Sequence, residues 1–271
     1  MTRLPTSVFS AWSERILTSA AYQRQQNGEE ECYWERHASD YAHNRTSGPH
    51  FRRVVEWLTR TIPHGASVLE IGPGPAVFTR PLAEHCRTIT VVEPSSALAR
   101  RIHHEIRGNY SLRIVNKRWE DVSLPLHDYV FSAGTLHLFV DIRETVGKML
   151  AHARSKVLLV LIDDSRALQR EVADACKLKE RCIGKPLSSL FAEVLAVLGL
   201  ASTWQSFTEE QTYRYPDMDV LIDLWREELE ITEDSRQDLL EYFRDKGFCN
   251  IGSGQIIIPR RFTSHLVEIA V

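Results

Sequence analysis

Five short apolar runs alternate with helix-like segments between residues 67 and 163, and this alternation constrains the fold more than any other feature. The runs lack the apolar-polar alternation of a half-exposed strand, which indicates burial on both faces. They read SVLEIG (67–72), TITVVEP (88–94), LRIVNKRW (112–119), DYVFSAG (128–134) and KVLLVLID (156–163). Buried strands that alternate with helices predict a parallel, doubly wound α/β sheet.

The predicted sheet occupies residues 49–164, and the rest of the chain divides into three parts. Residues 1–48 carry helical fragments, and residues 165–250 predict a mainly helical elaboration. Residues 251–271 predict a hairpin or an antiparallel edge strand that completes the sheet, with Pro259 in its turn. We therefore expect one α/β domain with an insertion rather than two independent domains.

The first apolar run ends abruptly in Gly72-Pro73-Gly74-Pro75. In an open parallel sheet, ligands bind outside the carboxyl ends of the strands, and glycine lets a ligand approach the backbone closely. The two prolines stiffen this turn and remove backbone donors, which suits contact better than phosphate capture. The dinucleotide fingerprint needs a third glycine where this chain has Val77, so a nicotinamide or flavin dinucleotide is a poor fit.

Acidic and aromatic residues follow the next two runs. Glu93 ends the second run, 19 residues beyond Gly74, where a carboxylate can accept hydrogen bonds from both hydroxyls of a ribose. After the third run, Trp119 can lie against an adenine face and Glu120 can accept from its amino group; the alternative is that Trp119 belongs to the core. The pattern indicates an adenosine-containing ligand without a pyrophosphate.

Four segments in order resemble the successive motifs of class I S-adenosylmethionine-dependent methyltransferases. They read VLEIGPGPA, VVEPS, RWEDVSLP and YVFSAGTLHLF. The resemblance covers residues 49–164 and is similar in layout to the small-molecule members of the family. It implies a Rossmann-like enzyme that uses S-adenosylmethionine and releases S-adenosylhomocysteine. It also implies that residues 1–48 form a lid and, with residues 165–250, shape the acceptor pocket.

The resemblance also implies which residues contact the cofactor. The glycine turn with Glu70 would hold the methionine part, Glu93 the ribose, and Trp119 with Glu120 the adenine. The full predicted set is Tyr41, Glu70, Gly72, Pro73, Gly74, Glu93, Pro94, Trp119, Glu120, Ser132 and Ala133. One position departs from the pattern: Ala76 stands where the family's loops often have a further glycine.

An aromatic segment precedes the predicted core, where related enzymes carry the lid. Tyr33 and Tyr41 are eight residues apart, so a helix places them on roughly the same face. Aromatic faces are good neighbours for a sulfonium cation, and we predict Tyr33 and His37 as substrate contacts. The alternative is an aromatic cluster that packs the N-terminal helix onto the core. Cys32, His37 and His43 match no standard metal-ligand spacing, so we expect no metal.

His137 follows the fourth run and is the candidate catalytic residue. It can face the transferred methyl group and act as a general base for a hydroxyl or amine nucleophile. A structural histidine near the start of a helix is the alternative.

The sequence favours a small-molecule acceptor over a nucleic acid. The formal net charge is -3, and the Asn/Asp-Pro-Pro-Tyr tetrad of amino-base methylases is absent after the fourth run. Residues 99–107 (ARRIHHEIR) are interpreted as a solvated helix face. One alternative is a methyltransferase that acts on a protein, and another is a cofactor-binding regulatory protein without catalysis. A dehydrogenase is a weaker alternative.

Location follows from two further patterns. No apolar run approaches the roughly 20 residues that span a bilayer, so we expect no membrane partner. The five cysteines form no Cys-x-x-Cys pair and favour reduced thiols in a cytoplasmic protein. The oligomeric state is left open.

Overall fold

The computed structural model describes residues 7–46, 48–108, 110–164, 166–177, 185–217, 219–222, 235–248 and 255–271. These residues divide into two compact units. The first contains Met1–Ile162, Leu187–Phe207 and Ser264–Val271, and the second contains Asp163–Pro186 and Thr208–Thr263.

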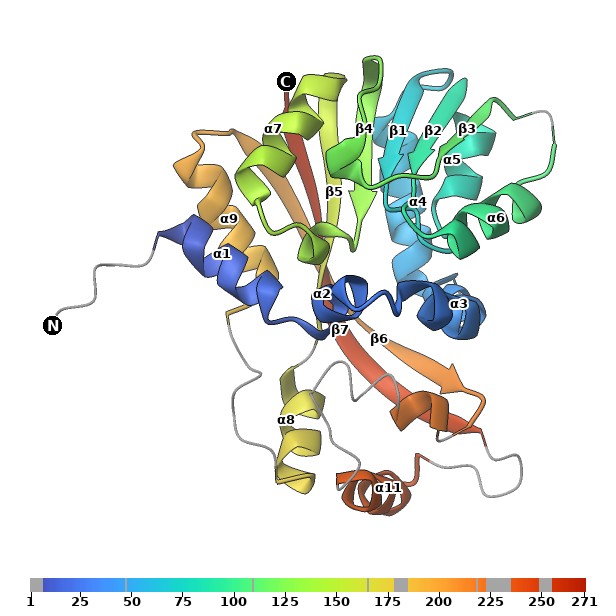
Figure 1. Ribbon diagram of the computed structural model, residues 1–271, viewed down its shortest axis with the longest axis vertical. Helices are drawn as coiled ribbons and strands as arrows, with labels where there is room; N and C mark the ends of the chain where they lie inside the picture. The colour runs from blue at the N-terminus through green and yellow to red at the C-terminus, as the bar shows by residue number, and fades with distance from the viewer. Residues whose placement is uncertain are drawn as a thin grey trace, which may run out of the picture. The chain divides into compact units, whose positions relative to one another are not determined.

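A seven-stranded sheet has the order β3-β2-β1-β4-β5-β7-β6 (Figure 1). The strands are β1 (Ser67–Ile71), β2 (Thr88–Val92), β3 (Leu112–Val115), β4 (His127–Ala133), β5 (Ala153–Asp164), β6 (Ser202–Tyr215) and β7 (Ile256–Ala270). The first five are parallel, and Glu70 of β1 lies between Val91 of β2 and Phe131 of β4. The order reverses between β1 and β4, which brings the carboxyl ends of these strands to one crevice. The predicted doubly wound, Rossmann-like sheet is confirmed.

The last two strands form the antiparallel edge pair. Ser206 Oγ lies 2.8 Å from His265 Nδ1, and Thr208 Oγ1 lies 2.8 Å from Thr263 Oγ1. Residue numbers thus rise along β6 as they fall along β7. The prediction of a turn at Pro259 is wrong, because this residue lies within β7 and is exposed. A proline is tolerated in a strand where its missing N–H leaves no buried partner unsatisfied.

Helices cover both faces of the sheet in the first unit. They are α1 (Val8–Leu17), α2 (Ala20–Gln26), α3 (Glu30–Thr46), α4 (Pro49–Thr61), α5 (Thr79–His85), α6 (Ser96–Glu105), α7 (Ile142–His152) and α9 (Leu187–Val197). Alternate β1 residues point to opposite faces. Leu69 packs in the cluster that includes residues of α1, α7 and α9, whereas Val68 packs with residues of α4, α5 and α6. Figure 1 shows α2 and α3 at the end of the sheet where β1, β2 and β4 finish.

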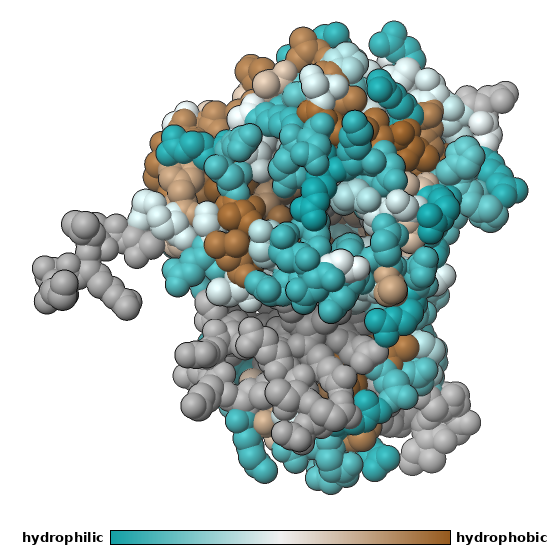
Figure 2. Space-filling model, in the orientation of Figure 1, coloured by the Kyte–Doolittle hydropathy of each residue, from teal (hydrophilic) through white to brown (hydrophobic). Residues whose placement is uncertain are grey.

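The surface of this unit is mixed in character. Figure 2 shows hydrophobic side chains gathered over α1 and α9, on the left, and hydrophilic side chains over α6, on the right. Leu17 of α1 and Val197 of α9 are among the exposed large apolar residues. The α6 side is therefore the more polar of the two in this view.

The second unit contains α8 (Arg166–Ala175), α11 (Arg236–Asp245) and the outer parts of β6 and β7. Glu171 accepts hydrogen bonds from Tyr242 Oη at 3.0 Å and from Lys246 Nζ at 2.6 Å. The predicted elaboration, 165–250, does not form one unit, because residues 187–207 belong to the first. Its role in shaping an acceptor pocket stays a prediction.

Candidate active site

The turn after β1 needs glycine at two positions for different reasons. Gly72 and Gly74 both have left-handed backbone angles, with φ of 65° and 56°. A Cβ atom at Gly72 would lie 2.5 Å from Cγ2 of Thr135, so a side chain there would collide with the turn after β4. A Cβ atom at Gly74 would meet no atom within 4 Å. Gly74 therefore offers open space where a ligand can approach the backbone.

Ala76 is a third left-handed residue in the same turn, with φ of 63°, and it is buried. An L-residue other than glycine pays roughly 1–2 kcal/mol in this conformation. The turn thus keeps the backbone shape that suits a glycine at this position while carrying a methyl group.

Glu70 has a buried carboxyl group in β1, just before the glycine turn. Its side chain is 2% exposed, and its Oε2 atom has no hydrogen-bond partner among the described residues. Burial is the main cause that raises the pKa of this carboxyl to about 8. Thr79 lies close enough to offset part of this rise, and a cationic group of a ligand at this point would favour the ionised carboxylate.

Glu93 joins the end of β2 to the glycine turn. Its Oε2 atom accepts from Gly74 N at 3.3 Å, and its Oε1 atom accepts from Ser95 N at 2.9 Å. Burial, and then the charges of Glu30 and Glu31, raise the pKa of Glu93 to about 8. The structure therefore brings together the two features that the sequence pairs across 19 residues. The role of Glu93 in holding a ribose stays a prediction.

The backbone around Glu93 is fixed from the neighbouring strand. Asn116 Nδ2 donates to the carbonyl oxygens of Glu93 at 2.8 Å and of Pro94 at 3.0 Å. The carbonyl of Pro94 is thus occupied, and the Pro94 side chain is exposed.

Trp119 opens the short helix η1 (Trp119–Asp121) after β3 and lies in the core. It is 3% exposed, its ring centroid lies 5.3 Å from that of His152, and Lys148 Nζ lies 4.7 Å from its centroid. Its Nε1 atom has no partner among the described residues, whereas Glu120 is exposed. Trp119 therefore packs in the core, and its contact with an adenine stays a prediction.

The end of β4 is hydrogen-bonded to the glycine turn. Ser132 Oγ donates to the carbonyl of Ile71 at 2.9 Å, and Thr135 Oγ1 lies 3.2 Å from the carbonyl oxygen of Gly72. The Ser132 hydroxyl therefore acts within the sheet, beside Ala133. Thr135 was missed by sequence reasoning, although its place directly after the small residues of β4 is a signal for it.

His137 lies in the short helix η2 (Leu136–Leu138) and is partly buried. Burial, and then the nearby Arg24, Arg45 and Arg15, lower the pKa of its imidazole to about 4. The side chain is therefore neutral at pH 7 and a weak base. Its predicted catalytic role stays a prediction.

The predicted aromatic residues of α3 pack against one another. The rings of Tyr33 and His37, both buried, lie 4.7 Å apart, and the Arg24 guanidinium lies 3.7 Å from the Tyr33 centroid. Tyr41 packs edge-on against Trp34 with centroids 5.5 Å apart. These contacts describe the packing of α2 and α3, and the predicted ligand contacts of Tyr33, His37 and Tyr41 stay predictions.

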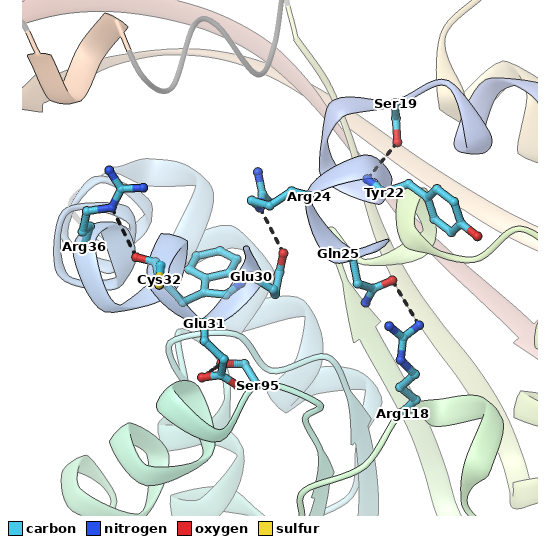
Figure 3. Close-up of polar contacts among 11 residues, drawn as sticks. Ser19, Tyr22, Arg24, Gln25, Glu30, Glu31, Cys32, Arg36, Ser95 and Arg118 are labelled. Atoms are coloured by element: carbon cyan, nitrogen blue, oxygen red, sulfur yellow. Dashed lines mark hydrogen bonds and ion pairs between the residues drawn. The ribbon is translucent and has the colours of Figure 1, made fainter. Parts of the chain in front are cut away.

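The N-terminal helices also contact the turns after β2 and β3, through residues that the sequence did not single out. Glu31 of α3 accepts hydrogen bonds at the start of α6, and Gln25 of α2 contacts Arg118 just before η1, as Figure 3 shows. Within the part of the chain that the structure describes, no group of three or more metal-ligating side chains occurs. No described helix is long and apolar enough to cross a membrane.

Comparison with known proteins supports the cofactor-binding core. Residues 50–157 match the family model described as ribosomal RNA adenine dimethylase. A probable ribosomal RNA small subunit methyltransferase A of Pyrobaculum aerophilum is 27% identical over 148 residues, which cover 52% of this chain and 55% of that protein. The ribosomal RNA small subunit methyltransferase A of Polaromonas naphthalenivorans is 37% identical over 95 residues, 33% of each chain. The chain thus spans about half the length, or less, of these relatives.

Solved structures share the fold at low sequence identity. The YcgJ protein of Bacillus subtilis has a TM-score of 0.53 and 14% identity, and the match covers 81% of this chain and 98% of that one. The plantazolicin methyltransferase BpumL has a TM-score of 0.51 and 12% identity, and the match covers 98% and 99%. These similarities describe the fold alone.

The prediction that excludes a nucleic-acid partner is wrong, because both the family match and the named relatives are ribosomal RNA methyltransferases. The small-molecule subtype also finds no support in these matches. Net charge misled because it sums over the whole chain, whereas nucleic acids respond to local charge. The glycine turn, the acidic residues Glu70 in β1 and Glu93 after β2, the strand order and the family match over residues 50–157 agree, and the core of this chain is similar to the cores of methyltransferases.

Proposed function

We propose that this chain transfers the methyl group of S-adenosylmethionine to RNA. The observation that carries the proposal is the match of the α/β core, residues 50–157, to the ribosomal RNA adenine dimethylase model. The relatives from Pyrobaculum and Polaromonas support the same acceptor class. A cytoplasmic location remains the expectation from the cysteine pattern.

The geometry of the crevice fits the cofactor. The buried carboxyl of Glu70 suits the ammonium of the methionine part, whose positive charge would favour the ionised form of the carboxyl, and the open space at Gly74 lets the ligand reach the backbone. Glu93 lies at the adjacent strand end, where a ribose would meet its carboxylate. When bound, the cofactor supplies a methyl group that its sulfonium already activates. The residues of this chain then have mainly to orient the ligand and exclude water.

A local basic surface supports an RNA acceptor. Between residues 96 and 118 the sequence has six arginines or lysines, two histidines and one glutamate. The side chains of Arg100, His103, His104, Arg107, Arg113, Lys117 and Arg118 are exposed on α6, on β3 and in the adjoining turns. Positive charge of this density attracts phosphates even where the whole chain is acidic.

The segment after β4 favours a second candidate. The residues from the end of β4 onward read Ser132-Ala133-Gly134-Thr135 and lack the tetrad that amino-base methylases carry there. His137, a few residues on, is neutral at pH 7. A protein that binds the cofactor and RNA without transferring the methyl group would have the same core and the same basic surface.

Transfer of a labelled methyl group distinguishes the two candidates. The purified chain is incubated with methyl-labelled S-adenosylmethionine and unmodified small-subunit ribosomal RNA, which is then digested to nucleosides and analysed by mass spectrometry. We expect label in methylated adenosine and its loss in the Glu93→Ala variant. Cofactor and RNA binding without label in any nucleoside would support the binding protein instead. Label in a low-molecular-weight acceptor but not in RNA would contradict the proposal.

A further inference from the structure

Glu31 of α3 binds the start of α6 with both carboxylate oxygens (Figure 3). Its Oε1 atom accepts from Ser96 N at 2.6 Å, and its Oε2 atom accepts from Ala97 N at 2.8 Å and from Ser95 Oγ at 3.2 Å. These donors include N–H groups that a helix leaves unpaired in its first turn. A carboxylate is favoured there because the N-terminal end of a helix carries partial positive charge.

The same turn holds Glu93 in place. Ser95 N donates to Glu93 Oε1 at 2.9 Å, while Ser95 Oγ lies 3.2 Å from Glu31 Oε2 and accepts from Leu98 N. Ser95 is therefore a direct link between the two carboxylates. A change in the position of Glu31 would be transmitted to Glu93 through one residue.

A second contact ties the N-terminal helices to the turn before η1. Gln25 Oε1 accepts from Arg118 Nη1 at 3.4 Å, and Arg24 of α2 pairs with Glu30 of α3 at 3.0 Å. The segment from Arg24 to Glu31 thus bridges the β2–α6 turn and the β3–η1 turn. The first turn carries Glu93, which the proposed function places at the ribose, and the second leads to Trp119 and Glu120, the predicted adenine contacts.

We propose that Glu31 is a positioning residue for cofactor binding: it seats the N-terminal helices on the β2–α6 turn and, through Ser95, aligns Glu93 with the ribose. This inference rests on the proposed cofactor site and adds to it a residue outside the α/β core. Glu31 itself does not touch the cofactor. It acts through the backbone that it orders.

The charge of Glu31 predicts a second measurable effect, on the ionisation of Glu93. The carboxyls that face Glu93 are Glu31 and Glu30, from α3, and Glu70, from β1. Glu31 therefore aligns Glu93 and also opposes its ionisation, because like charges disfavour the charged form. Neutralising Glu31 should therefore move the ionisation of Glu93 to lower pH by more than a variant that disturbs the same contacts but keeps the charge.

The test is isothermal titration of the full chain with S-adenosylhomocysteine between pH 6 and pH 9. At pH 9, where Glu93 is ionised, we expect Glu31→Gln to weaken binding about 10-fold, since one charged acceptor of several hydrogen bonds is lost. The pH midpoint of binding should also move to lower pH. Glu31→Asp keeps the charge but shortens the side chain, so it should weaken binding without moving the midpoint.

Glu35→Gln is the matched control. Glu35 lies one turn further along α3 and also pairs with α6, through Arg100 at 3.7 Å, but both side chains are more than half exposed. Exposed pairs contribute little, so binding and midpoint should stay as in the wild type. The 2′-deoxy analogue of S-adenosylhomocysteine tests whether Glu31 acts through Glu93, because this analogue lacks one of the ribose hydroxyls that Glu93 would bind. The loss of binding affinity caused by Glu31→Gln should be smaller for this analogue than for S-adenosylhomocysteine.

The outcomes separate this inference from the proposed function. A folded wild type that binds no S-adenosylhomocysteine would overturn both. Wild-type binding with equal affinities for Glu31→Gln and Glu35→Gln at pH 9 would overturn only the role of Glu31. An equal loss for the two ligands would show that Glu31 does not act on the ribose contact, which also contradicts the inference.

Discussion

Single residues in the glycine turn set both its backbone conformation and the free energy that this conformation costs. Ala76 has φ of 63°, a conformation that glycine adopts without steric penalty. We expect Ala76→Gly to raise the free energy of unfolding by about 1 kcal/mol, after the extra chain entropy of glycine offsets part of the relieved strain. Chemical denaturation of both proteins measures this difference. A lower free energy of unfolding for the variant would mean that the buried methyl group packs better than its backbone strain costs.

The two buried acids predict how stability depends on pH. Burial raises the pKa values of Glu70 and Glu93 from 4.5 to about 8. Between these values the folded state holds protons that the unfolded state has released, so stability must fall as the pH rises from about 4.5 to about 8. Each carboxyl contributes a slope of up to roughly 1.4 kcal/mol per pH unit.

Denaturation of the ligand-free protein from pH 5 to pH 8 measures this slope. Glu70→Gln should remove the contribution of one carboxyl and flatten the curve. Glu56→Gln, at an exposed position of α4, should leave the curve unchanged. Equal slopes for Glu70→Gln and the wild type would mean that Glu70 is ionised in the folded protein.

At the scale of elements, α6 and β3 carry the basic surface. We expect Arg113→Glu with Lys117→Glu to weaken RNA binding and to reduce the slope of log affinity against log salt by roughly two, one for each phosphate that the variant no longer neutralises. Arg52→Glu, an exposed change on α4, is the matched control and should have a much smaller effect. Filter binding at several salt concentrations measures both values. An unchanged salt slope in the double variant would place the RNA elsewhere.

At the scale of the whole molecule, the N-terminal helices contact the turns that we propose to hold the cofactor. The contacts of Glu31 and Gln25 tie α2 and α3 to the turns of the core. If residues 29–45 act as a lid, S-adenosylhomocysteine should protect them from protease and from hydrogen exchange. Tyr41→Ala should then lower turnover and cofactor affinity together. Equal protection with and without the ligand, together with wild-type kinetics for Tyr41→Ala, would mean that the segment only packs against the core and does not act as a lid.

The sequence by itself determined the parts of this protein that depend on local patterns. The runs of β1, β2, β4 and β5 are apolar because both of their faces are buried, and this shows within each run, whereas β3 lies at the edge of the sheet and is only partly buried. The glycine turn and Glu93 could be predicted because turn chemistry and strand ends leave signals over a few residues. Trp119 shows the limit, since an aromatic residue at a strand end suits either a ligand or the core.

Only the tertiary structure decided the features that depend on distant residues. Pro259 lies in β7, between β5 and β6, and no local pattern gives a strand its neighbours. Glu31 meets Ser95 across 64 residues, and Trp12 donates to the carbonyl of Phe139 across 127. Such contacts form because folding brings unpaired donors and acceptors together, and the sequence records each partner without recording the pair.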